Sequence, residues 1–109
     1  LALSNTIRSA VTTWGKTLSN EVAESNITVN NILTGYFNTE RLEQLNSEKA
    51  KKMGVKVEEV FDAMKNQVPA KRIGNPKEFG YLATFLSSDY ASYINGINIA
   101  IDGGLIKSL

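Results

Sequence analysis

Near the start of this 109-residue chain, apolar side chains recur at three- and four-residue steps. This spacing puts them on one face of a helix, and it predicts a helix from about Ser4 to about Glu24. Ser4 or Asn5 is placed to cap the helix, because short polar side chains accept hydrogen bonds from the first free amides. The stripe consists of Ile7, Ala10, Val11, Trp14, Leu18 and Val22.

A short segment rich in β-branched residues follows this helix directly. Residues 27–33 (ITVNNIL) predict a strand that ends at Thr34 and Gly35. Near the other end of the chain, residues 97–101 (INIAI) alternate between apolar and other residues and predict a second strand. A helix that leads at once into a buried strand is typical of α/β proteins with parallel strands.

The segment between the two strands begins with polar residues of less regular spacing. Thr39 or Asn38 is placed to cap a helix over residues 40–47, and a second helix is predicted over 57–66. A charged helical insertion directly after a strand, here at about 36–66, is typical of a lid over a binding site. An ordinary surface helical hairpin has the same composition, so both interpretations stay open.

A third helix is predicted to start at residues 75–78 (NPKE). Asn75 is suited to the cap, Pro76 to the first helical position, and Glu78 to the capping-box position. The complete order is therefore helix, strand, helical insertion, helix, strand.

Composition excludes several functional classes. Twelve basic and eleven acidic residues give a net charge of +1, so no basic excess calls for nucleic acid. No segment approaches the ~20 apolar residues of a membrane span. The chain has no cysteine and no histidine, so we expect no disulfide and no metal site. A cysteine-free chain of this size fits one small domain in a reducing, cytoplasmic compartment.

Four segments, in order and at the right spacings, resemble the short-chain dehydrogenase/reductase family. One lies in the first helix, one is the first strand with its turn, one surrounds the third helix start, and one closes the chain. They are residues 16–21 (KTLSNE), 27–35 (ITVNNILTG), 69–78 (PAKRIGNPKE) and 96–104 (GINIAIDGG). The resemblance implies an α/β fold, the C-terminal portion of a doubly wound parallel-sheet, Rossmann-type domain. Residues 1–109 would form that portion, and the N-terminal half that binds the nucleotide would be absent.

The same resemblance implies a cofactor, NAD or NADP. In the family, the turn after the first of these strands wraps the nicotinamide end of the cofactor. The backbone of that turn and a threonine four residues after its glycine hold the carboxamide. These positions are Gly35, Phe37 and Thr39 in this sequence, whereas Thr34 replaces the family's proline. Thr39 is also placed to cap a helix, and the two roles are compatible.

The chain departs from the family at its catalytic Tyr-x-x-x-Lys motif. The alignment of residues 16–21 puts Ser4 at the tyrosine position and Arg8 at the lysine position. An aliphatic hydroxyl titrates far above a phenol, and no histidine is present to activate it. Arg8 keeps the positive charge and could donate to ribose hydroxyls, but it does not shuttle a proton. Tyr36 is a weaker candidate for the missing proton donor.

Two functions therefore stay open. The complete protein would be an NAD(P)-dependent oxidoreductase acting on a carbonyl or secondary alcohol, for example with a 3-oxoacyl reductase-like activity. Alternatively, it would be a catalytically degenerate homologue that binds cofactor in a sensing or structural role. Residues 1–109 alone are expected to be inactive, and the family resemblance implies a homodimer or homotetramer.

Overall fold

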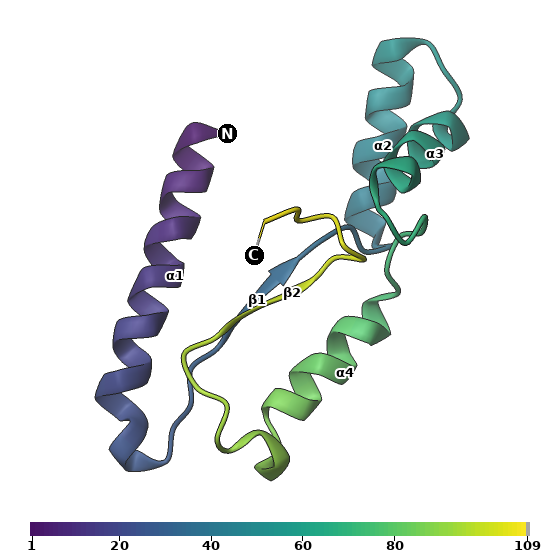
Figure 1. Cartoon of the computed structure of the whole chain (residues 1–109). Helices are drawn as coiled ribbons and strands as arrows, with labels where there is room; N and C mark the ends of the chain where they lie inside the picture. Colours follow the sequence, from purple (N-terminus) through teal and green to yellow (C-terminus); the bar gives the residue numbers. More distant parts are fainter. Residues whose placement is uncertain (109) are drawn as a thin grey trace. The chain divides into compact units, whose positions relative to one another are not determined.

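The computed structural model of the chain describes residues 1–108 (Figure 1). It has the predicted order of helices and strands. The elements are α1 (Ala2–Val22), η1 (Ala23–Ser25), β1 (Asn31–Thr34), α2 (Glu40–Met53), α3 (Val57–Gln67), α4 (Pro76–Leu86), η2 (Asp89–Ala91) and β2 (Asn98–Ile101).

Contacts divide the chain into two compact units. The first unit combines Leu1–Leu33 with Tyr81–Ile99, and the second combines Thr34–Gly80 with the C-terminal segment from Ala100. Each unit is held together by its own hydrogen bonds.

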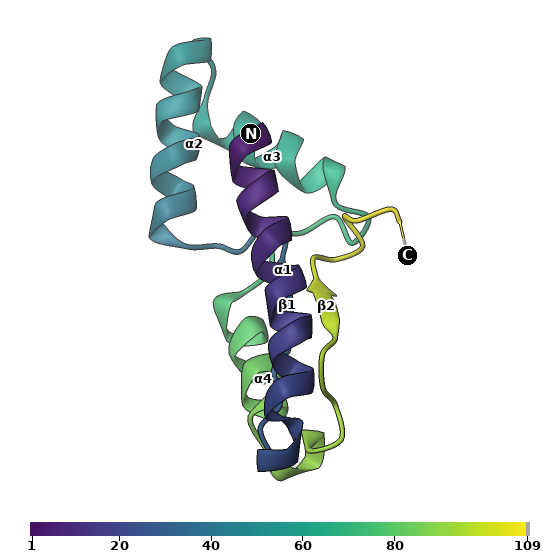
Figure 2. The same cartoon turned by 90° about the vertical axis from the view of Figure 1, so that its left-hand side faces the viewer.

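β1 and β2 form a two-stranded parallel sheet, as predicted (Figures 1 and 2). The amide of Asn31 donates to the carbonyl of Ile97 (2.9 Å), and the amide of Gly35 donates to the carbonyl of Ile101 (3.0 Å). Both partners advance by four residues in the same direction, which is the register of a parallel pair.

In the first unit, β1 begins at Asn31 and not at Ile27, as the sequence had predicted. Over the residues before it, one backbone bond remains, from the amide of Gly96 to the carbonyl of Val29 (2.8 Å), and asparagine side chains make the other contacts. The amide of Val29 donates to Asn95 Oδ1 (2.9 Å), and Asn30 Nδ2 donates to the carbonyl of Ile94 (3.1 Å). The β-branched composition predicted an extended chain correctly, but not which groups would bind its amides.

The long helix α1 begins at Ala2, earlier than predicted, and its N-cap is Leu1. No side chain caps it, so the prediction of Ser4 or Asn5 as the cap is wrong. Asn5 instead donates its backbone amide to the carbonyl of Leu1 (2.9 Å), which is an ordinary first helical bond.

Small residues form the buried part of α1. Gly15 and Ser19 are its buried residues, and a Cβ at Gly15 would lie 3.0 Å from Asn31 Nδ2. The predicted apolar stripe is largely uncovered within residues 1–108, because Ile7, Val11 and Trp14 are 55%, 51% and 62% exposed. Periodicity identified the helix correctly but did not identify the face that packs in the first unit.

In the second unit, α2 and α3 form a helical hairpin (Figure 2). Thr39 caps α2 as predicted, with its hydroxyl accepting the amide of Leu42 (3.2 Å). The helix runs to Met53, beyond the predicted end. Lys51 and Lys52 lie in its last turn, where their positive charges interact favourably with the negative end of the helix dipole. Gly54 then ends it in the left-handed conformation (φ 67°).

No helix in the described part of the chain is long and apolar enough to cross a membrane.

The carboxyl ends of β1 and β2 meet at Gly35 and Asp102. A Cβ at Gly35 would fall 2.6 Å from Asp102 Cα, a distance that real Cβ contacts do not reach. The obstacle is backbone, so a larger side chain could be placed only if the strand ends moved apart.

We therefore expect Gly35→Ala to destabilise the complete protein by about 1–3 kcal/mol, the usual cost of overpacking. Gly80→Ala is the matched control, because Gly80 lies in α4 and a Cβ added there would have no atom within 4 Å. The control should raise stability by about 0.5–1 kcal/mol through helix propensity. Urea unfolding of both variants measures the difference, and equal midpoints would contradict the packing argument.

Candidate functional site

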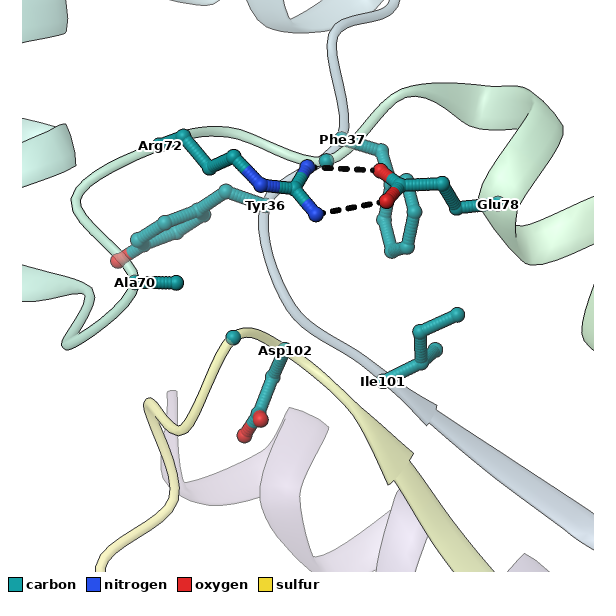
Figure 3. Close-up of a pocket in the computed structure, with 9 residues that line it drawn as sticks. Tyr36, Phe37, Ala70, Arg72, Glu78, Ile101 and Asp102 are labelled. Carbon is teal, nitrogen blue, oxygen red and sulfur yellow. Dashed lines mark hydrogen bonds and ion pairs between the residues drawn. The ribbon is translucent and has the colours of Figure 1, made fainter.

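A small hollow of about 100 Å³ lies at the carboxyl end of β2 in the second unit (Figure 3). Ile101, Asp102 and Gly103 line it from the strand and its turn. The other lining residues come from the turn after β1 and from the segment that leads into α4: Tyr36, Phe37, Ala70, Arg72, Gly74 and Glu78.

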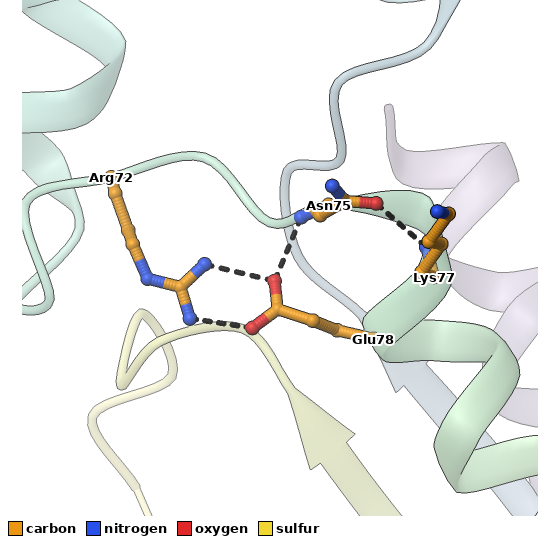
Figure 4. A network of polar contacts seen from close by, with 4 residues as sticks. All are labelled: Arg72, Asn75, Lys77 and Glu78. Carbon is orange, nitrogen blue, oxygen red and sulfur yellow. Dashed lines mark hydrogen bonds and ion pairs between the residues drawn. The ribbon is translucent and has the colours of Figure 1, made fainter.

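An ion pair between Arg72 and Glu78 lies beside this hollow (Figures 3 and 4). Arg72 Nη2 donates to Glu78 Oε1 (2.6 Å) and Nη1 to Oε2 (2.8 Å), so the pair is bidentate. The hydrogen bond with Glu78 raises the pKa of Arg72. The pKa of Glu78 is lowered to about 2. The hydrogen bond from Arg72 is the largest cause, and the hydrogen bond from the backbone amide of Asn75 is the second.

Glu78 also completes the capping box predicted for α4 (Figure 4). Its Oε2 accepts the amide of Asn75 (2.8 Å), while Asn75 Oδ1 accepts the amide of Lys77 (2.9 Å). One carboxylate therefore both caps α4 and binds Arg72, six residues earlier. Both charges serve the fold of this segment and are already paired.

Asp102 organises the turn after β2. Its carboxylate accepts the amides of Ile106 (2.8 Å) and Gly104 (2.9 Å), and these bonds lower its pKa. Gly103 packs against Val68 and Ala70, whose amide donates to the carbonyl of Gly103 (3.1 Å). The double glycine therefore packs within its own unit.

A second hollow, of about 450 Å³, opens beside the turn after β1. The structure brings together three of the four residues predicted to bind the cofactor, because Gly35, Phe37 and Thr39 all line this hollow. The fourth, Arg8, lies on α1 in the first unit. Of the other residues that line this hollow, most are apolar residues of α2 and α4. These other lining residues are Thr34, Tyr36, Arg41, Leu42, Leu45, Pro76 and Phe79.

Phe37 offers an unpaired amide and carbonyl at this turn. It forms a parallel bridge with Gly74, in which the amide of Asn38 donates to the Gly74 carbonyl (2.9 Å) and the Gly74 amide donates to the Tyr36 carbonyl (2.8 Å). The N–H and C=O of Phe37 itself have no partner within residues 1–108. In such a bridge they point to the side opposite Gly74, and they have the donor and acceptor that a carboxamide needs.

The aromatic ring of Phe37 fixes the position of this backbone. It packs edge-to-face on Phe79 with ring centroids 6.0 Å apart. A Cβ at Gly74 would lie 2.8 Å from the ring, so Gly74 is small because Phe37 occupies that space.

Comparisons with known proteins identify the family of the chain. The family profile described as enoyl-(acyl carrier protein) reductase matches residues 2–106. The chain belongs to the short-chain dehydrogenase/reductase family.

Curated relatives are reductases of the same family. The NADPH-dependent reductase BacG of Bacillus subtilis is 35% identical over 103 residues, which cover 94% of this chain and 40% of the relative. The 3-oxoacyl-[acyl-carrier-protein] reductase FabG of Chlamydia trachomatis is 36% identical over 96 residues, covering 84% and 33%. The chain thus spans about two fifths or less of the length of these two relatives.

Solved structures of the family share the fold. The crystal structure of L-sorbose reductase from Gluconobacter frateurii, complexed with NADPH and L-sorbose, superposes with a TM-score of 0.90 at 31% identity. The match covers 96% of this chain and 40% of that one. The predicted fold class is confirmed: the chain is part of a doubly wound, Rossmann-type α/β domain.

Ser4 and Arg8, at the positions of the family's tyrosine and lysine, lie one turn apart on α1 in the first unit. Both are exposed, and neither side chain makes a hydrogen bond within the described residues. The carbonyl of Arg8 accepts the hydroxyl of Thr12 (3.0 Å). Their assignment as site residues of this dehydrogenase/reductase chain stays a prediction.

Sequence reasoning did not identify Arg41 and Gln67 as neighbours of the site. Arg41 lines the larger hollow, and Gln67 Oε1 accepts the hydroxyl of Tyr36 (3.3 Å). Arg41 lies two residues after Thr39, so its closeness to the turn was a usable signal. The contact of Gln67 joins residues 31 positions apart and had no local signature. Within residues 1–108, no acidic cluster could hold a metal ion.

The lowered pKa of Glu78 predicts how acid affects stability. A carboxylate whose pKa falls from 4.5 to about 2 on folding stabilises the folded state above the higher value. That contribution is lost as the pH falls from about 4.5 towards 2. Glu78→Gln should therefore flatten the loss of stability in this window, as measured by urea unfolding of the complete protein at a series of pH values. Glu48→Gln, at a surface carboxylate without a hydrogen bond in the described residues, serves as control and should keep the wild-type profile.

Proposed function

We propose that the complete protein is an NAD(P)-dependent oxidoreductase that interconverts a carbonyl compound and a secondary alcohol. The specific example that we propose within this class is a 3-oxoacyl reductase-like activity. The observation that carries the proposal is the free amide and carbonyl of Phe37, a residue that lines the same hollow as Gly35 and Thr39. The reductase relatives support the same reaction class.

The residues of the hollow fit the nicotinamide end of such a cofactor. The N–H and C=O of Phe37 match a carboxamide, and the Thr39 hydroxyl can still donate a hydrogen bond while its oxygen accepts the Leu42 amide. When bound, the cofactor supplies a hydride to the carbonyl carbon, and the carbonyl oxygen takes a proton. Leu42, Leu45 and Phe79 would keep water away from the reacting groups.

The structure also gives Gly35 a role that does not involve the cofactor. Asp102 fills the space that a side chain at Gly35 would need, so the glycine lets the two strand ends approach each other. We therefore assign Gly35 to positioning the turn and the cofactor contacts to Phe37 and Thr39.

On α1, we propose that Arg8 donates hydrogen bonds to ribose hydroxyls and supplies positive charge near them. Ser4 is a poor proton donor, since its hydroxyl has no base beside it among the residues described. The proton then comes from another part of the complete protein or through water. The second candidate function follows from the same two residues: a homologue that binds cofactor but catalyses weakly, in a sensing or structural role.

The exposed stripe of Ile7, Val11 and Trp14 on α1 supports the proposed homodimer or homotetramer. The residues follow each other at steps of four and three, which gives a continuous apolar seam.

Thr39 allows the cap and the cofactor contact to be separated. Thr39→Asn keeps a good capping group but removes the hydroxyl, whereas Thr39→Val removes both. We expect both variants to bind NADPH about tenfold more weakly in nicotinamide fluorescence titrations of the complete protein, by the loss of one hydrogen bond. Only Thr39→Val should also lose about 1 kcal/mol of stability. Unchanged affinity in Thr39→Asn would restrict Thr39 to capping.

A second experiment separates the two candidate functions. The complete protein is titrated with NADH and NADPH separately and then assayed with a panel of ketones. Turnover by the wild type supports the oxidoreductase. Binding without turnover, together with activity in the Ser4→Tyr/Arg8→Lys double variant, supports the degenerate homologue. Absence of binding to either cofactor contradicts both. Ser4→Ala is the control, and it should leave wild-type turnover within about twofold because Ser4 lacks an activating base.

A further inference from the structure

Arg41 is the one charged residue that lines the larger hollow, as far as the described chain shows. It lies in the first turn of α2, two residues after Thr39. The side chains around it are apolar, chiefly Leu42, Leu45 and Phe79. Arg41 is exposed to water in this structure. A bound molecule that covered its guanidinium would remove that water, so such a molecule would have to supply an acceptor or an anion in return.

The guanidinium of Arg41 is not engaged in the fold. Its one hydrogen bond within residues 1–108 runs from Nη1 to Gln44 Oε1 at 3.5 Å, the outer limit for such a bond. The ion pair found in these residues joins Arg72 to Glu78, so Arg41 has no carboxylate within 4.0 Å. Glu40 and Glu43 share the first turn of α2 but do not line the hollow.

The position of Arg41 also costs stability by itself. The N-terminus of a helix carries partial positive charge, which disfavours a cation in the first turn. Glu40 and Glu43 offset that charge, yet neither forms an ion pair with Arg41. Structural capping of α2 is done by Thr39, so the fold supplies no reason for an arginine here.

We propose that Arg41 binds the carboxylate of the substrate, and hence that the preferred substrates are oxo acids with an apolar body. The inference rests on the proposed reduction of a carbonyl compound and names the substrate class of the same site, a free oxo acid in place of a 3-oxoacyl thioester, whose carboxyl group carries no charge. Arginine forms a planar fork of donors that matches a carboxylate, while the apolar walls accept the hydrocarbon part. The carboxylate is unchanged in the reaction, in which the carbonyl carbon gains a hydride from the reduced cofactor and the oxygen gains a proton.

A cofactor phosphate is the competing anion. Dinucleotide folds hold the pyrophosphate at a glycine-rich turn after the first strand of the domain. The groups that share the hollow with Arg41 are those assigned to the carboxamide, which is neutral. The anion nearest to that end of the cofactor is therefore expected to come from the substrate.

The test compares 3-oxohexanoate with its ethyl ester, which has the same carbonyl but no charge. The complete protein is assayed with NADPH as wild type, Arg41→Gln and Arg41→Lys, and Lys77→Gln controls for the loss of a surface cation elsewhere. We expect Arg41→Gln to lower kcat/KM for the acid about ten- to hundredfold, the usual effect of one charge-assisted hydrogen bond. The ester should change by less than about threefold, Arg41→Lys should keep part of the preference, and Lys77→Gln should behave as wild type.

Two results would overturn the inference while leaving the proposed function intact. One is an equal fall in kcat/KM for acid and ester, and the other is a weaker NADPH affinity in Arg41→Gln, which would assign Arg41 to the cofactor. If the wild type reduces neither compound, the proposed function fails, and calorimetry then decides the inference separately. In that case calorimetry should show that 3-oxohexanoate binds the NADP⁺-loaded wild type but does not bind the Arg41→Gln variant. If 3-oxohexanoate does not bind the wild type either, the inference is overturned as well.

Discussion

The close approach of Gly35 and Asp102 at the ends of β1 and β2 determines how the second unit is built. Because a Cβ at Gly35 would lie 2.6 Å from Asp102 Cα, the two chains leave the sheet in contact with each other. Asp102 can then turn its carboxylate to the amides of Gly104 and Ile106 and hold the following turn. The residues after Gly35 start from a fixed point, which places Phe37 beside Gly74.

A second set of contacts fixes the other side of that turn. The Gly103 carbonyl accepts the amide of Ala70, and Arg72, two residues later, binds Glu78 at the start of α4. Phe37 is held between Gly74 and Phe79 in the same segment. The turn after β1 is therefore supported by backbone hydrogen bonds, an ion pair and an aromatic contact, which suits a site whose binding groups are main-chain atoms.

Sequence patterns predicted those features whose causes are local. Thr39 as a cap and the box of Asn75 and Glu78 depend on residues within three positions, so spacing identifies them. The start of β1 and the buried face of α1 were missed, because they depend on asparagine side chains and small residues that meet across more than fifteen positions. The contact of Gly35 with Asp102 had no local signature either, since Asp102 is 67 residues away in sequence.

The charged and polar groups near the site fall into two sets, according to whether they already have strong hydrogen-bond or ion-pair partners in the fold. Glu78, Arg72 and Asp102 are bound to side chains or amides, and the pKa values of Glu78 and Asp102 are lowered as a result. These groups are poor candidates for proton transfer, because their charged forms are stabilised by partners that the fold needs. Within residues 1–108, the amide and carbonyl of Phe37 have no partner, and the guanidinium of Arg41 has only a long hydrogen bond to Gln44 (3.5 Å) and no carboxylate partner. Under our proposals, these groups would bind and orient a neutral amide and an anion, and proton transfer would be left to residues outside the second unit or to water.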